Sequence, residues 1–275
     1  MNNILNEVTF GIMSLKDFDN RELAQSVFET IADAGDSFFP TVYDVYEPLR
    51  RKCSQKDIDE LVRFWVNEEN AEKTAQQQYG MGQILMEHRR KPKISYQMYW
   101  EKSQQERFNY FVLRIDLEFL KESKNFQKFM TLCSRLVILL DPVQGGITNR
   151  SFPGWDEPIN LQVRHPELNW MVYFGKPYIE LFGREKLMNT PCYCVDTISE
   201  NVISLQMAAD VFQPISTEDR RTVKSYLGAD AFVAEGKDYR SYKAGIVPRF
   251  DFSNVLFDKD SPIIQPSIRM RGTNF

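Results

Sequence analysis

Apolar residues alternate with other residues near the start of the chain and then change to helical spacing. Residues 7–15 place Val8, Phe10 and Ile12 on one face of an extended segment. The apolar positions that follow recur every three or four residues until Gly35, a residue type that commonly ends helices. The pattern predicts a strand followed by an amphipathic helix.

A period of two returns in three consecutive segments, which cover residues 80–90, 93–100 and 107–120. The first two are separated near Lys91-Pro92, and the third places Phe111 and Leu113 on one face. Short alternating runs joined by turns are typical of hairpins. The sequence therefore predicts a three-stranded antiparallel meander.

Four further helices are indicated by their start and stop signals. Two carry the capping-box pattern, in which a serine is followed three residues later by an acidic residue. A third helix ends at an Asp-Pro pair. The remaining one has a proline near its first turn, where the missing backbone N–H costs nothing. In chain order they start at Ser54 (with Asp57), Ser123 (ending at Asp141-Pro142), Pro177, and Ser216 (with Asp219, ending at Gly228).

The second half of the chain adds short extended segments. A brief strand is expected around residues 145–148, another before Pro177, and a hairpin over residues 190–208, while the irregular arm from Gly245 to Phe275 wraps the body. We expect an α+β fold with antiparallel sheet(s), helices packed on one face and an irregular C-terminal arm. Residues 1–275 form one domain, or two tightly packed sub-domains with a seam near residues 150–165.

Composition places the chain among cytoplasmic globular proteins. Its 275 residues are 43% hydrophobic, enough for a large core, and the N-terminus lacks the basic and apolar regions of a signal peptide. No window approaches the length of a membrane-spanning segment. The four cysteines are few for a disulfide framework, so we expect reduced thiols and a cytoplasmic location.

Charge is unevenly distributed along the chain. The formal net charge is −4, but residues 1–75 contain 8 Lys and Arg against 15 Asp and Glu. An acidic first quarter disfavours nucleic-acid binding there, because phosphate contacts need clustered basic residues. It suits a partner protein with a basic surface.

Catalytic and cofactor-binding patterns are missing. The chain has two histidines, His88 and His165, which removes most triad and zinc arrangements. Cys192 and Cys194 could hold zinc or supply a nucleophile paired with His165, but half-buried cysteines of a strand explain them more simply. Glycines do not occur in phosphate-binding frames. We therefore predict no catalytic, cofactor-binding or metal-binding residue and no cofactor.

The best candidate for a contact surface is a loop rich in aromatic residues together with the acidic face of the helix after it. Aromatic anchors beside charged residues are common in protein interfaces. A solvated helix face, and aromatic residues that pin the loop to the core, are the simpler alternatives. The predicted partner-binding residues are Tyr43, Asp44, Tyr46 and Glu47 in the loop and Asp57, Glu60, Glu68 and Glu69 on the helix.

A resemblance sharpens this hypothesis. The order W-x-x-Y-F-G-x-P-Y from Trp170, followed by F-G-x-x-x-L from Phe182, a hairpin and a capped helix, resembles the C-terminal half of bacterial immunity proteins. These belong to polymorphic-toxin and type VI secretion systems, in particular the immunity-52 type, and the resemblance covers residues 110–230. It implies a non-enzymatic cytoplasmic protein that binds and neutralises a cognate protein toxin.

Two other classes of function stay open. One is a hydrolase with a carboxylate-based or cysteine-based site, which would require a deep pocket with titratable residues. The other is a self-assembling structural subunit whose C-terminal arm packs on a neighbouring copy. The sequence leaves the oligomeric state undetermined.

Overall fold

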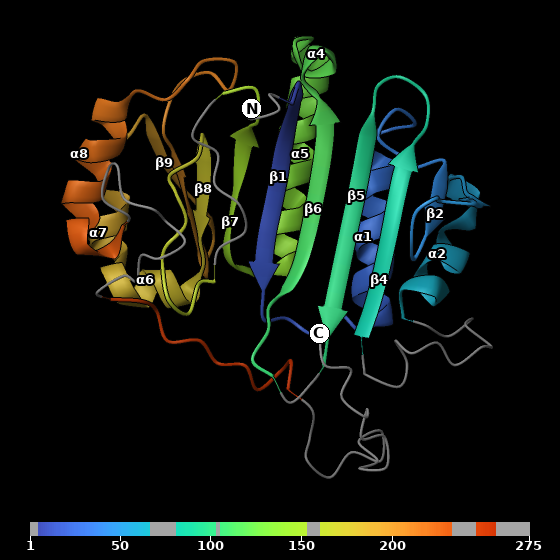
Figure 1. Cartoon of the computed structure of the whole chain (residues 1–275), viewed down its shortest axis with the longest axis horizontal. Helices are drawn as coiled ribbons and strands as arrows, with labels where there is room; N and C mark the ends of the chain where they lie inside the picture. Colours follow the sequence, from blue (N-terminus) through green and yellow to red (C-terminus); the bar gives the residue numbers. More distant parts are fainter. Residues whose placement is uncertain (1–4, 67–80, 103–104, 153–159, 233–245, 257–275) are drawn as a thin grey trace, which may run out of the picture.

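One antiparallel sheet forms the centre of the protein (Figure 1). The computed structural model describes residues 5–66, 81–102, 105–152, 160–232 and 246–256. Within them ten strands pair in the order β3-β2-β4-β5-β6-β1-β7-β8-β10-β9. The bounds are β1 Glu7–Ser14, β2 Val42–Asp44, β3 Arg51–Lys52, β4 Met81–His88, β5 Ile94–Glu101, β6 Asn109–Asp116, β7 Pro142–Asn149, β8 Met171–Phe174, β9 Cys194–Ser199 and β10 Val202–Gln206.

The predicted meander is confirmed as β4, β5 and β6. The first strand, β1, lies between β6 and β7, with Gly11 opposite Val112 on one side and Gly146 on the other. Both neighbours lie more than a hundred residues further along the sequence, so β1 joins the meander to the second half of the chain. The predicted hairpin is also confirmed, as β9 paired with β10.

Three helices cover one face of the sheet from β4 to β7. They are α1 Arg21–Asp33, α2 Ile58–Trp65 and α5 Ser123–Leu140, and Figure 1 shows α1 and α5 behind the strands. The short α4 Leu117–Leu120 connects β6 to α5. Alternate residues of β1, β5 and β6 are buried beneath these helices, as the period of two requires. Strand side chains of this kind include Phe10, Tyr96 and Phe111, which share the core with Phe129 of α5.

Three further helices of the described residues lie on the opposite face, at the β8–β10 end. They are α6 Lys176–Phe182, α7 Arg184–Met188 and α8 Thr217–Leu227. Strand β8 is buried along its whole length because Met171 and Tyr173 join the first core, whereas Val172 and Phe174 pack in a second core with these helices. The α+β class is confirmed. Helices occupy both faces rather than the single face that we expected, because β8 and β10 are buried on both sides.

Helix boundaries follow the sequence signals closely. Ser54 and Asp57 form the predicted capping box, although the first turn is a 3₁₀ helix, and the Ser216 side chain accepts from the backbone N–H of Asp219. Gly228 has φ 131°, a left-handed value that glycine adopts without strain, and it ends α8. None of the helices in the described ranges has the length and apolar character needed to cross a membrane.

The described part of the C-terminal arm packs against the lower end of β1 and β7. Phe252 and Val255 share a small core with Leu15, Val143 and Leu161. Residues 246–252 contain neither helix nor strand, as predicted for this segment. Gly245 and residues 257–275 of the predicted arm lie outside the described residues.

Candidate functional site: a contact loop and a sheet-face cavity

The predicted contact loop presents two of its four candidate residues to solvent. Tyr46 is 67% exposed, the largest exposure among the large hydrophobic side chains of the described residues. Glu47 beside it is also exposed. An exposed aromatic next to a carboxylate keeps this part of the predicted surface available to a partner.

Tyr43 must be removed from the predicted contact surface. Its side chain is completely buried, packs edge-on against Phe64, and its hydroxyl donates a hydrogen bond to Glu60. Burial, strengthened by the Glu60 carboxylate, raises the pKa of Tyr43, so the phenol keeps its proton. Phe38 and Phe39, which precede Tyr43 in the chain, are also buried in the core. These buried aromatic side chains anchor the loop to the core.

Three of the four predicted carboxylates that lie in the described residues are used within the fold. Asp44 accepts from the backbone N–H groups of Val45 and Arg50, at 2.8 and 3.3 Å. Asp57 accepts from the Ser54 backbone at 2.8 Å, and Glu60 accepts from Tyr43. Between Asp44 and Asp57 the chain carries three consecutive basic residues, Arg50 and the β3 residues Arg51 and Lys52, which offset the acidic charge. Glu68 and Glu69 lie outside the described residues.

The cysteine and histidine arrangement does not favour nucleophilic chemistry. Burial raises the pKa of Cys192 to about 11 and also raises the pKa of Cys194, so both thiols are protonated near neutral pH. His165 lies among Tyr178, Phe182 and Phe232, with its Nε2 2.7 Å from the carbonyl oxygen of Ile246. The described residues contain no cluster of three or more side chains suited to a metal ion.

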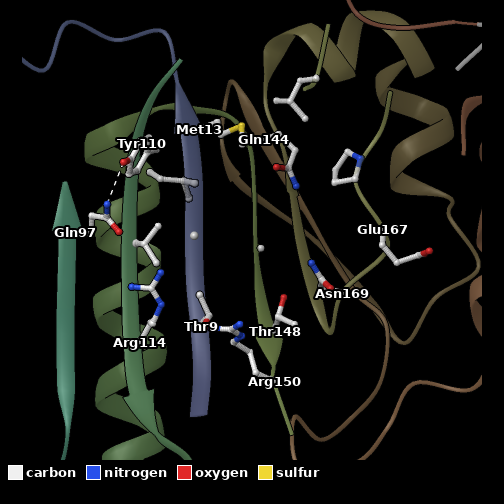
Figure 2. Close-up of a pocket in the computed structure, with 16 residues that line it drawn as sticks. Thr9, Met13, Gln97, Tyr110, Arg114, Gln144, Thr148, Arg150, Glu167 and Asn169 are labelled. Atoms are coloured by element: carbon white, nitrogen blue, oxygen red, sulfur yellow. Dashed lines mark hydrogen bonds between the residues drawn. The ribbon is translucent and has the colours of Figure 1, made fainter. Parts of the chain in front are cut away.

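A cavity of about 560 Å³ lies on the sheet face opposite α1, α2 and α5 (Figure 2). Its floor is made by β5, β6, β1 and β7, and one wall by residues 161–169. Volumes of this size are common for small-molecule sites. The strand side chains that line the cavity come from alternating positions, on the side of the sheet that faces away from the main core. They are Thr9, Met13, Gln97, Tyr110, Val112, Arg114, Gln144, Thr148 and Arg150.

Two arginines stand at one end of this cavity. Figure 2 shows Arg114 and Arg150 on either side of Thr9. Arg150 forms an ion pair with Glu7 at 2.8 Å, whereas Arg114 makes no hydrogen bond or ion pair with any described residue. The Thr9 hydroxyl also has no hydrogen-bond partner among the described residues. This end therefore carries an uncompensated positive charge.

Neutral polar groups line the other end. Gln97 Nε2 donates to the Tyr110 hydroxyl at 3.1 Å, as the dashed line in Figure 2 marks. Burial raises the pKa of Tyr110, and Gln97 and Arg114 oppose that shift. The phenol therefore stays protonated, and its own proton is available to an acceptor in the cavity. The lining carboxylate of Glu167 is neutralised by Lys224 at 2.7 Å.

Sequence reasoning missed this cavity. The polar alternation of Gln97, Tyr110 and Arg114 was visible, but it predicts only the solvent side of a meander. The cavity exists because β1 and β7 extend that side and because residues 161–169 rise beside it. Neither fact can be read from local patterns. Gly11, which has no atom within 4 Å of where a Cβ would stand, is the one sequence signal for an open floor.

Comparisons with known proteins include a distant structural neighbour. No family model matches the chain, and no curated protein matches it in sequence. Among solved structures, the Pseudomonas aeruginosa T6SS protein PA0821 superposes with a TM-score of 0.50 at 12% identity, over 92% of this chain and 82% of that one. The chain therefore shares its fold with a protein associated with type VI secretion.

Proposed function

We propose that the protein is an immunity protein that binds and neutralises a cognate protein toxin of a type VI secretion system. The observation that carries this proposal is the shared fold with a type VI secretion protein over 92% of the chain. The resemblance of the segment from Trp170 to that of immunity proteins points to the same system. In this proposal the protein acts by binding in the cytoplasm and needs no catalytic residue or cofactor.

The toxin contacts the exposed end of the aromatic loop. Tyr46 supplies the anchor, because a large aromatic side chain that is 67% exposed gains most from burial in an interface. Glu47 and Asp59 are exposed carboxylates close to it in the sequence and suit a basic rim on the toxin. Asp44, Asp57 and Glu60 hold the backbone and the Tyr43 hydroxyl, so they support this surface rather than form its centre.

The experiment is a growth-rescue assay with the toxin-domain protein encoded beside this gene. Cells that express that protein should die, and co-expression of the full chain should restore growth. Rescue, together with stoichiometric co-purification of the two proteins, would support the proposal. If the full chain is expressed in folded form and does not protect, the proposal fails.

A matched pair of double variants locates the surface. Tyr46→Ala with Glu47→Lys should weaken toxin binding at least a hundredfold and abolish rescue. Tyr193→Ala with Glu200→Lys makes the same changes at exposed positions near the β9–β10 hairpin, where Tyr193 is 63% exposed. It should leave binding unchanged. Equal losses in both variants, or no loss in the first, would remove the loop from the interface.

A further inference from the structure

We infer that the cavity on the open sheet face binds a small organic anion with a planar body, held at its charged end by Arg114. This site is separate from the contact loop and does not depend on the toxin-binding proposal. The ligand class is an organic carboxylate or phosphate monoester, which share the oxyanion that the site recognises. The inference rests on charge, on the polar groups at both ends and on the shape of the floor.

The charged end selects an oxyanion. A guanidinium group offers parallel N–H donors that match a carboxylate or phosphate, and it binds them best where water is partly excluded. Arg114 is half-buried on β6 and has no partner within the described residues, which leaves all of its donors to a ligand. Arg150 adds a second positive group, although Glu7 offsets it. The cavity carboxylate, Glu167, is paired with Lys224, so the net charge facing the ligand is positive.

The floor of the cavity favours a ligand with a planar group. Gly11 and Gly146 are neighbours across β1 and β7 and both line the cavity, but a Cβ at Gly146 would stand 2.6 Å from the Met171 carbonyl oxygen, so the open part of the floor lies at Gly11. A Cβ added at Gly11 would meet no atom within 4 Å, which shows that the space above this residue is empty. Val112 and Leu161 supply apolar contacts beside it. A planar apolar group can therefore lie on the strands.

The far end can hold a second polar group of the ligand. The Tyr110 hydroxyl accepts from Gln97 and keeps its own proton for an outside acceptor. Asn169 and Gln144 line the same cavity from the wall and from β7. Convergent donors and acceptors of this kind fix the orientation of a ligand in small-molecule sites.

The test is calorimetric and NMR titration of the full chain with benzoate and with phenyl phosphate. Benzyl alcohol serves as the probe that has the ring but no charge, and inorganic phosphate as the probe that has the charge but no ring. Benzoate or phenyl phosphate should saturate with a dissociation constant on the order of 1 mM or tighter, as for a fragment-sized ligand. The stronger of the two identifies carboxylate or phosphate as the preferred group. Benzyl alcohol and inorganic phosphate should bind at least tenfold more weakly.

Two variants tie binding to the cavity. Arg114→Gln removes the charge and should weaken the stronger probe at least tenfold, while Arg90→Gln, an exposed arginine of the β4–β5 turn, should have no effect. Gly11→Val fills the floor from an open position and should also weaken binding at least tenfold. Thermal unfolding of each variant checks that it is folded. Absence of saturable binding by the unmodified chain, or binding unchanged in both Arg114→Gln and Gly11→Val, would overturn the inference.

Discussion

The two faces of strands β1, β5 and β6 differ in almost every property, although the same eight-residue segments supply both. One face carries Phe10, Phe111 and Leu113, all fully buried under α1 and α5. The other carries Thr9, Gly11 and Arg114, and no described helix covers it between β4 and β7. The first face stabilises the fold by removing apolar surface from water. The second contributes little to that core and is therefore free to carry a binding site.

The largest effect should come from truncating the buried face. Phe111→Ala removes a ring that contacts both Phe10 and Tyr96, and it should lower the free energy of unfolding by about 3–5 kcal/mol. Val112→Ala, one residue along on the opposite face, is the matched control and should cost about 1 kcal/mol or less because its side chain is only half-buried. Urea unfolding of both variants measures the difference. Equal losses would mean that the second face is also core.

A second contrast uses two glycines that lie on opposite faces of neighbouring strands. A Cβ at Gly145 would stand 2.5 Å from Ile12 Cγ2 and 2.8 Å from the Gly11 carbonyl oxygen, so Gly145→Ala should destabilise the protein by about 1–3 kcal/mol. Gly11→Ala meets nothing and should leave stability unchanged or raise it by up to about 1 kcal/mol. Thermal unfolding separates them. A loss with Gly11→Ala as large as that with Gly145→Ala would contradict the open floor.

The difference between the faces also explains what the sequence could predict. Buried alternation is a local signal, so the strands β1, β4, β5 and β6 and the helix from Ser123 were found with nearly correct bounds. The sheet order was not, because the pairing of β1 with β6 and β7 depends on contacts between distant parts of the chain. The second core was missed for the same reason: the apolar run of β8 does not reveal that both of its faces are covered.

The candidate site was harder to predict than the fold. Acidic residues beside aromatic anchors predict partner contacts, yet Asp44 and Asp57 accept hydrogen bonds from backbone N–H groups beside them. Such local hydrogen bonds compete with any external role and leave no separate mark in composition. The cavity, in contrast, draws its residues from several strands and a distant loop. A site assembled from long-range contacts has no sequence motif.

A third prediction concerns the second core, where a titratable group is buried. Burial lowers the pKa of His165 below its ordinary value of 6.5, and the Ile246 carbonyl opposes this shift. The unfolded chain then binds more protons than the folded chain, so the stabilising contribution is present above about pH 6.5 and is lost as pH falls below it. Urea unfolding from pH 7.5 to 5.5 should show this slope. His165→Phe keeps the aromatic contacts and should flatten it; an unchanged slope would assign the loss to other groups.

The smallest expected effect lies on the open face, at the Glu7–Arg150 ion pair. Its atoms are 2.8 Å apart, but both side chains are partly exposed, so solvent screening should limit their coupling to about 0.5 kcal/mol. Single variants would not measure this quantity, because Arg150 takes part in more than one interaction. A double-mutant cycle with Glu7→Gln and Arg150→Gln isolates the pair, since contributions that do not involve both residues cancel. A coupling above about 2 kcal/mol would show that the pair is effectively buried. The open face would then stabilise the fold as well as bind a ligand.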